Sequence, residues 1–331
     1  MAEPNKGVVG ERGPGSLRVL APGVPGRRGD TTEAQVWTVE GRRAGMRSDQ
    51  LATEEPLEIR LLTEEAGLIR LEGRGSVAAP TACRTIAITM RTPGDDLDLA
   101  AGFLHGERIV RKRGDIRRVS FCQDRALEAE WRDNVVNVEL RAGLKPDLGS
   151  LERHFYTTSA CGVCGKASLD ALRLRGYAAV PTGPVIAPAI LCGLAKKLRA
   201  AQAIFGATGG LHAAALFDAE GKLLALREDV GRHNAVDKLV GWALMEGRLP
   251  LHGHVVMVSG RSSFEILQKC LAAGVPIVCA VSAPSSLAVA LAREFHVTLI
   301  GFLRGERFNV YAGVERVRGA AESSEVIPSS L

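Results

Sequence analysis

The last third of the chain alternates regularly between short apolar runs and longer stretches of helical period. Strands are expected at residues 255–258, 277–281 and 297–300, and helices at 232–245, 263–273 and 285–295. Strands that alternate with helices of this length predict parallel βαβ units, because a parallel neighbour is reached only through a crossover connection. From Glu228 onward the pattern is therefore that of a doubly wound α/β layer.

A second, smaller unit precedes this layer. Its strands are expected at 57–61, 84–90, 116–122 and 135–140, and its helix at 97–107, after the turn 93–96. Between the two units, apolar residues at helical spacing predict a helix over 190–205, and 211–217 with 223–227 predict a hairpin. The expected fold class is α/β. An α+β domain at residues 53–150 is followed by an α/β core with a mixed or parallel sheet at 151–319.

The two ends of the chain show neither pattern. Residues 1–52 are rich in Gly, Pro, Arg and Glu and have no apolar period, so they are expected to be a disordered extension. Translation could start at Met46 instead of Met1. Residues 320–331 are expected to be a flexible tail.

Composition argues against several classes of protein. The chain has 331 residues, of which 46% are hydrophobic and 24% charged, as in a soluble protein with room for two cores. The formal net charge is only +5, and no basic stripe is interleaved with aromatic residues, so nucleic-acid binding is not expected. We find no run of about 18 apolar residues and no leading apolar segment. A cytoplasmic protein without a membrane anchor is expected.

Two of the seven cysteines, Cys161 and Cys164, form a CxxC motif. The other five stand singly in apolar runs and are expected to behave as small buried hydrophobic residues. A short helix is expected at 167–174, and both its N-terminal dipole and Lys166 should lower the pKa of a thiol in the motif. In a reducing compartment such a pair is expected to do sulfur chemistry or to bind a metal.

Three explanations compete for this motif. A structural zinc site needs two more ligands, yet the chain has no second CxxC or CxxH motif. A zinc deaminase requires H-x-E followed by P-C-x-x-C; residues 105–107 match the first part, but Ala160 stands where the proline should be. The third explanation, which we favour, is a sulfur relay in which one thiolate accepts sulfur as a persulfide.

Three loops follow the carboxyl ends of the expected parallel strands. Ligands bind at this edge of an open parallel sheet, and hydroxyls, arginines and helix N-termini together favour a phosphate or pyrophosphate. Each loop also has a simpler explanation as a helix start, since Ser262-x-x-Glu265 matches a capping box. The candidate ligand residues in these loops are Arg261, Ser262, Ser282, Ser285, Phe302, Leu303, Arg304, Gly305, Glu306 and Arg307.

Two further stretches are dense in polar or flexible groups. Residues 228–238 cross a strand-to-helix junction, and their composition favours a ligand site or a dimer contact over a solvated helix start. Residues 208–212 contain two glycines that permit close backbone approach, although the histidine there is as readily explained by packing in a core. The candidates from these stretches are Asp229, Arg232, His233, Asn234, Gly209, Gly210 and His212.

These motifs, in this order, resemble the FdhD/NarQ family of formate dehydrogenase accessory sulfurtransferases. The resemblance covers residues 53–315 and includes the segments 90–96, 102–104, 159–165, 208–214, 228–238, 260–265, 281–288 and 301–311. It implies a cytidine-deaminase-like core and a homodimer, and it does not imply bound zinc.

The resemblance also implies an activity. Such proteins take sulfur from a cysteine desulfurase as a persulfide and pass it to the molybdenum (or tungsten) bis(molybdopterin guanine dinucleotide) cofactor that formate dehydrogenase requires. Cys161 would carry the persulfide, with Cys164 as its partner. Guanine nucleotides such as GDP are expected to bind.

The resemblance further implies that the segment 302–307 contacts the cofactor. Arg261, Arg304 and Arg307 would then meet its phosphates. The alternatives are a zinc-dependent deaminase or hydrolase, and a chaperone that binds the cofactor without transferring sulfur.

Overall fold

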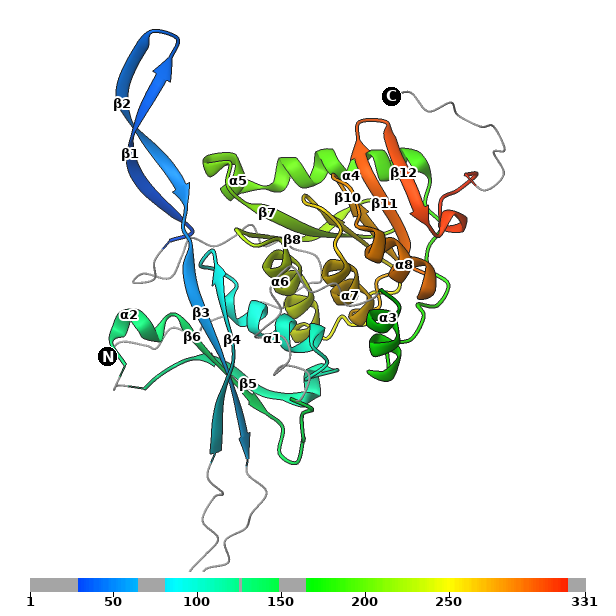
Figure 1. The fold of residues 1–331 in the computed structure, drawn as a ribbon, viewed down its shortest axis with the longest axis horizontal. Helices are drawn as coiled ribbons and strands as arrows, with labels where there is room; N and C mark the ends of the chain where they lie inside the picture. Colours follow the sequence, from blue (N-terminus) through cyan, green and yellow to red (C-terminus); the bar gives the residue numbers. More distant parts are fainter. Residues whose placement is uncertain (1–28, 65–80, 125–126, 149–164, 321–331) are drawn as a thin grey trace, which may run out of the picture.

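The structure, a computed structural model, describes residues 29–64, 81–124, 127–148 and 165–320 (Figure 1). These residues form an N-terminal two-stranded hairpin, a four-stranded sheet and a six-stranded sheet. One of the two larger sheets lies within residues 53–150 and the other within residues 151–319. The α/β class with an α+β first part is confirmed. Within the described ranges, no helix is long and apolar enough to cross a membrane.

The four-stranded sheet has the strand order β4-β3-β6-β5. Alternation along β3 places Leu57, Ile59 and Leu61 in a core shared with helix α1. Every strand and the helix predicted here are confirmed to within a few residues. The elements are β3 (Glu55–Glu64), β4 (Thr81–Arg91), α1 (Asp96–Gly106), a 3-10 turn (Arg113–Asp115), β5 (Ile116–Phe121), α2 (Ala129–Arg132) and β6 (Val135–Leu140).

Helix α1 joins the small domain to the core by crossing α6 (Arg232–Met245) at very short range. A Cβ atom on Gly102 would lie 1.9 Å from the carbonyl oxygen of Asp237, and one on Gly241 would lie 1.8 Å from that of Asp98. Only glycine permits this approach of two helix backbones. The two domains therefore share one closely packed helix interface.

The six-stranded sheet is mixed and has the order β12-β11-β10-β9-β7-β8. Strands β9, β10 and β11 pair in parallel, whereas β7 and β12 run antiparallel to their neighbours. The predicted β7–β8 hairpin and the parallel units are confirmed. The strands are β7 (His212–Phe217), β8 (Leu223–Asp229), β9 (Val255–Val258), β10 (Ile277–Ala280), β11 (Thr298–Arg304) and β12 (Arg307–Ala312).

The sheet was predicted to be doubly wound, with its connecting helices divided between the two faces, and this is wrong. Helices α7 (Phe264–Ala272) and α8 (Ser286–Glu294) pack with α6 on one face, together with α3 (Gly165–Leu174). The strand order advances in one direction from β9 to β11, so right-handed crossovers bring both connecting helices to the same side. Among the described helices, α4 (Pro188–Ala201) is the one that packs its apolar side chains on the opposite face.

The helix predicted over 190–205 is interrupted at Gln202. Helix α4 ends at Ala201, and a short helix α5 (Ala203–Thr208) follows. Gln202 has a ψ of 89°, which is not helical. The Glu228 carboxylate accepts hydrogen bonds from the backbone N–H groups of Ile204 (3.1 Å) and Phe205 (2.9 Å), so it stabilises the new helix start.

The segment 302–307, predicted as a loop, is instead the tip of a β-hairpin. Strand β11 extends to Arg304 and β12 begins at Arg307, which leaves only Gly305 and Glu306 as the turn. Phe302 and Gly305 have positive φ angles of 53° and 56°, and the strand register shifts between Gly301 and Arg304. The hairpin was missed because its irregular register hides the alternation of side chains. A 3-10 turn (Val314–Arg316) follows β12.

The N-terminal extension was predicted to be disordered over residues 1–52, and this is wrong for residues 31–52. Strands β1 (Thr31–Glu40) and β2 (Arg43–Ala52) form an antiparallel hairpin that turns at Gly41, where φ is 60°. No residue of β1 is fully buried, so the strand lacks the apolar alternation by which a half-buried strand is recognised. Residues 1–28 and 321–331 lie outside the described ranges.

Candidate functional site

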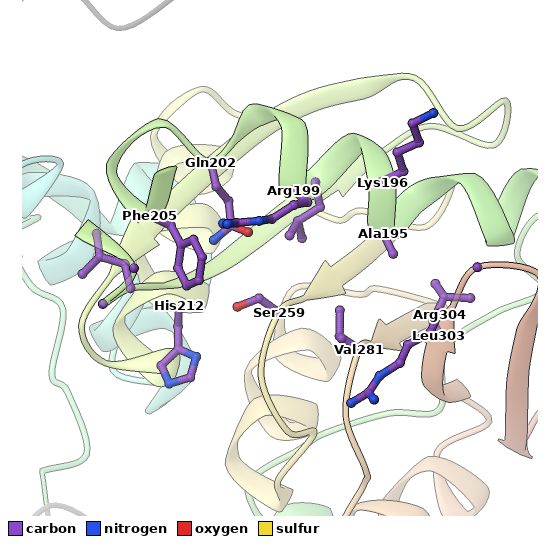
Figure 2. Close-up of a pocket in the computed structure, with 15 residues that line it drawn as sticks. Ala195, Lys196, Arg199, Gln202, Phe205, His212, Ser259, Val281, Leu303 and Arg304 are labelled. Carbon is purple, nitrogen blue, oxygen red and sulfur yellow. The ribbon is translucent and has the colours of Figure 1, made fainter. Parts of the chain in front are cut away.

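A cavity of about 740 Å³ opens between helices α4 and α5 and the carboxyl-terminal edge of the six-stranded sheet (Figure 2). The sheet edge is the predicted location, but the two helices, which were not predicted to contribute, supply much of the wall. The lining residues are Ala195, Lys196, Leu198, Arg199, Gln202, Phe205, Gly209, Gly210, Leu211, His212, Ser259, Val281, Leu303, Arg304 and Gly305.

The Arg199 side chain extends from α4 over the Phe205 ring, as Figure 2 shows. The guanidinium carbon lies 3.9 Å from the ring centroid, which is a close cation–π stack. Lys196 and Arg304 add two more cations to the wall. The cavity therefore combines flat stacking surfaces with positive charge, as recognition of a planar, anionic ligand requires.

Gln202 contributes a buried polar group. Its carboxamide lies beside Glu228, but Nε2 makes no hydrogen bond of normal geometry to any described residue. A buried N–H donor without a partner is costly, so a ligand atom that accepts a hydrogen bond would be favoured here. Burial raises the pKa of Glu228, and the two N–H groups of α5 lower it in part.

His212, at the start of β7, lies between the cavity and the N-terminus of α6. A Cβ atom on Gly260 would lie 3.3 Å from His212 Nδ1 and 3.7 Å from Arg232 Cβ, so these residues are in contact range. Burial lowers the pKa of His212, and the nearby charges of Arg232 and His233 lower it further. His212 is therefore expected to be neutral at pH 7.

Comparison with known proteins identifies the family. The FdhD/NarQ family model matches residues 76–318. The chain belongs to the FdhD/NarQ family. A curated relative from Streptomyces coelicolor, named sulfur carrier protein FdhD, is 49% identical over 290 residues, which are 87% of this chain and 95% of the relative. A relative of the same name from Sulfurisphaera tokodaii is 41% identical and covers 86% of this chain and 97% of its own.

A crystal structure shares the fold. It is that of a candidate formate dehydrogenase accessory protein from Desulfotalea psychrophila, which is 24% identical to this chain. The superposition has a TM-score of 0.63 and covers 87% of this chain and 99% of the other.

The segment 302–307, which was expected to contact the cofactor, is only partly at the cavity. Leu303, Arg304 and Gly305 line it. Phe302 is exposed and, like Glu306 and Arg307, is not among the lining residues. Of the three arginines predicted to meet phosphates, Arg304 lines the wall, whereas Arg261 and Arg307 are not among the lining residues.

The polar residues of the 228–238 stretch divide into two groups. Asp229 is fully buried: it pairs with Lys238 at 2.8 Å and accepts a hydrogen bond from the Thr92 N–H. Asn234 donates to the carbonyl oxygen of Met90 at 2.7 Å. These two predicted ligand residues instead fasten the turn after β4 to the core, because their polar atoms are already used inside the protein.

His233 lies at the N-terminus of α6, beside Glu265. Its Nε2 is 2.9 Å from Glu265 Oε2 and 3.1 Å from Ser263 Oγ. His233 thereby holds the pKa of the Glu265 carboxyl below its usual range. The predicted capping box at Ser262 is wrong: Ser263 is the N-cap of α7 and makes no side-chain cap bond.

The remaining hydroxyls have structural positions. Ser285 is the N-cap of α8 and accepts a hydrogen bond from the Ala288 N–H, so its simpler explanation is confirmed. The carbonyl oxygen of Ser282 accepts the Phe302 N–H. Ser262 is fully buried, and its Oγ has no hydrogen-bond partner among the described residues.

Cys161 and Cys164 lie outside the described residues. The helix that follows them in sequence, α3, contributes Leu172 to the cluster of α6, α7 and α8, on the sheet face opposite α4.

His105, the first residue of the H-x-E match, is buried, and its Nε2 donates to the carbonyl oxygen of Ala272. That histidine therefore packs inside the protein. The described residues contain no group of three or more His, Cys, Asp or Glu side chains that could hold a metal ion.

The cavity residues that sequence missed come from α4 and α5. Lys196, Arg199 and Gln202 recur every three residues on the polar side of the predicted helix 190–205. That spacing signals a shared helix face but does not distinguish a solvated face from a ligand-facing one.

Proposed function

We propose that this chain is a sulfur carrier and sulfurtransferase for formate dehydrogenase maturation. It would accept sulfur from a cysteine desulfurase as a Cys161 persulfide and deliver it to the molybdenum (or tungsten) bis(molybdopterin guanine dinucleotide) cofactor, which is its substrate. Family membership and the name sulfur carrier protein FdhD, borne by the similar relatives, support the carrier role. The observation that carries the proposal is the cavity of Figure 2.

The chemistry of the cavity suits one nucleotide arm of that substrate. Pockets of about 300–1,000 Å³ hold ligands of drug size, so a cavity of about 740 Å³ suits one arm better than the whole cofactor. The stacked Arg199 and Phe205 offer a flat surface to a base. Lys196 and Arg304 offer cations to a pyrophosphate, and Gln202 offers a buried N–H donor.

Sulfur loading exchanges one S–S bond for another. The Cys161 thiolate attacks the terminal sulfur of the desulfurase persulfide, the new bond forms at Cys161 Sγ, and the desulfurase thiolate leaves. Helix α3 begins at Gly165, directly after the motif in sequence, and a helix N-terminus favours the thiolate form. Three positions after Cys161 in the sequence, Cys164 is available as a second thiol.

Delivery of the sulfur as sulfide requires two electrons. Attack of the Cys164 thiolate on Cys161 Sγ would release hydrosulfide and leave a Cys161–Cys164 disulfide. A dithiol reductant of the cytoplasm would then restore both thiols. In this order of reaction steps, Cys164 acts in the release of the sulfur and has no role in its loading onto Cys161.

Mass spectrometry after incubation with a cysteine desulfurase and cysteine tests the loading step. We expect the mass of one extra sulfur atom on the peptide that contains Cys161. Cys83 is an exposed free thiol, so Cys83→Ala is a matched control that should load as the wild type does. Absence of the adduct from Cys161 in active protein would refute the relay.

The chaperone and hydrolase alternatives give different results. If the chain only binds the cofactor, Cys161→Ala should leave formate dehydrogenase maturation intact. If it is a zinc-dependent hydrolase, metal analysis of the purified protein should find zinc in proportion to activity.

A further inference from the structure

The connection between α1 and β5 concentrates positive charge. Residues 108–118 contain six basic side chains and one acidic one, so this segment has a formal net charge of +5. The whole chain has the same formal net charge, so basic and acidic side chains balance in the rest of it. Charge gathered at one place creates a strong local field even in a protein that is otherwise nearly neutral.

The one acidic residue of this segment is used inside the turn. Asp115 is buried, and its carboxylate accepts hydrogen bonds from the backbone N–H groups of Arg111 (2.9 Å) and Lys112 (3.1 Å). The side chains of Arg111, Lys112 and Arg113 are exposed. The Asp115 carbonyl oxygen accepts the N–H of Arg141, which is exposed as well. We call these four cationic residues the basic surface.

Three of these cations are not neutralised by the part of the chain that the structure describes. Arg111, Lys112 and Arg141 form no ion pair with a described residue, whereas the nearby Arg117 lies 3.9 Å from Glu139. Exposed like charges that are held close together repel one another. A partner that brings negative charge would therefore be favoured at the basic surface.

The basic surface is hollowed beside the end of α6. Arg111, Lys112 and Arg113 line a hollow of about 230 Å³, and Leu244 and Leu249 are among its other walls. Pockets that hold ligands of drug size measure about 300–1,000 Å³, so this hollow suits a side chain of a partner protein better than a free cofactor. A carboxylate there would form charge-assisted hydrogen bonds with the surrounding cations.

The basic surface lies beside α3, the helix that directly follows the CxxC motif in sequence (Figure 1). Arg108 joins the two: its guanidinium donates to the Gly176 carbonyl oxygen at 2.9 Å and lies 4.3 Å from the centroid of the Tyr177 ring. With ten residues, α3 is about 15 Å long. A standard interface covers about 800 Å² on each partner and is roughly 30 Å across, so one partner can cover both the basic surface and the start of α3.

Two further features favour a protein partner over a nucleic acid. Leu174, the last residue of α3, is 89% exposed and adds an apolar contact beside the cations, as in an interface with an apolar centre and a polar rim. Residues 108–118 contain no aromatic side chain on which a base could stack. The expected partner is therefore a protein with an acidic surface.

We propose that the basic surface is the docking site for an acidic surface of the cysteine desulfurase that loads sulfur onto Cys161. This inference rests on the proposed function, because only a sulfur donor needs to reach the start of α3. Complementary charges speed the encounter of two proteins and fix their orientation. Docking at the basic surface thus brings the donor's persulfide to the helix that follows the two thiols.

Charge reversal at two exposed positions tests the docking site. In biolayer interferometry with the cysteine desulfurase of the same organism, Arg111→Glu/Lys112→Glu should associate at least about tenfold more slowly than the wild type at low salt, and the difference should shrink as salt is added. Lys222→Glu/Arg318→Glu is the matched control: it changes the net charge equally at two exposed positions outside the segment and should bind as the wild type does. Circular dichroism should show the wild-type fold in both variants.

Sulfur loading gives a second readout. At low desulfurase concentration, Arg111→Glu/Lys112→Glu should load Cys161 about tenfold more slowly than the wild type. Loading from inorganic tetrasulfide, a small donor that needs no docking surface, should match the wild type.

Two results would overturn the proposal. One is unchanged association and unchanged loading by the desulfurase after charge reversal. The other is a wild type that binds a DNA duplex more tightly than the desulfurase and loses the duplex on charge reversal. Failure of the proposed function would look different: the wild type would take no sulfur onto Cys161 from either donor, while binding of the desulfurase would still report on the basic surface.

Discussion

Arg199 stacks on Phe205 across the break between two helices, with 3.9 Å between the guanidinium carbon and the ring centroid. The stack exists because α4 stops at Ala201 and α5 restarts the chain in a new direction. The Glu228 carboxylate stabilises that restart by accepting two backbone N–H groups. A carboxylate at the end of β8 thus positions an aromatic side chain in the cavity wall.

Replacing Arg199 or Phe205 by alanine is expected to weaken binding of GDP. Stacking on such a surface contributes about 1–3 kcal/mol per base, which corresponds to a loss of affinity of roughly 5- to 150-fold. Isothermal titration calorimetry measures the change. Arg248 stacks on Trp242 at 5.1 Å, away from the cavity, so Arg248→Ala is the matched control and should bind as the wild type does. If Arg199→Ala binds GDP with the same affinity as the wild type, the stacked pair is not part of the ligand site.

Gly102→Ala is expected to destabilise the protein by about 3 kcal/mol or more, because the added Cβ would lie 1.9 Å from a backbone oxygen of α6. Urea unfolding monitored by circular dichroism gives the change in the free energy of unfolding. Gly193 in α4 is the control, since a Cβ there meets nothing within 4 Å. Gly193→Ala should instead stabilise the helix by about 0.5–1 kcal/mol. Similar effects of the two substitutions would contradict the close crossing of α1 and α6.

His105 is expected to make stability depend on pH. Burial lowers its pKa to about 4 from the ordinary 6.5, so between these values the unfolded chain binds more protons than the folded one. The contribution of neutral His105 to the free energy of unfolding is fully present above pH 6.5. It is lost as the pH falls to 4, and the total loss is about 3 kcal/mol. Burial raises the pKa of Asp98 and Asp237 to about 6, which acts in the opposite direction.

The variant His105→Gln isolates this contribution. Glutamine can still donate to the Ala272 carbonyl oxygen but does not titrate. The difference in unfolding free energy between wild type and variant should change steadily from pH 7 to pH 4, in the direction of a relatively less stable wild type. A difference that does not vary with pH would show that His105 is protonated equally in both states.

Regular, buried elements could be predicted from the sequence, whereas exposed and internally paired residues could not. Helix α6 has the predicted bounds because Val236, Leu239 and Val240 recur at helical spacing and are all buried. Strand β1 has no such signal, since its side chains remain partly or fully exposed. Asp229 was assigned to a ligand site because a sequence cannot reveal that Lys238, nine residues later, neutralises it inside the core.

The cavity, too, could be predicted from the sequence only in part. Its sheet-edge half was predicted from the positions at which parallel strands end, which topology dictates. Its helical half depends on the direction in which α4 crosses the sheet and on the break at Gln202, both of which are set by long-range contacts such as those of Glu228.

The central claim is that sulfur carried on Cys161 reaches a substrate held in the cavity beside Arg199. The direct measurement is transfer of radiolabelled sulfur from desulfurase-loaded protein to the guanine dinucleotide cofactor, in wild type, Arg199→Ala and Cys161→Ala. The account predicts that Arg199→Ala loads sulfur normally but delivers it at least about tenfold more slowly, while Cys161→Ala neither loads nor delivers. Delivery by Arg199→Ala at the wild-type rate, or by Cys161→Ala at any appreciable rate, would contradict it.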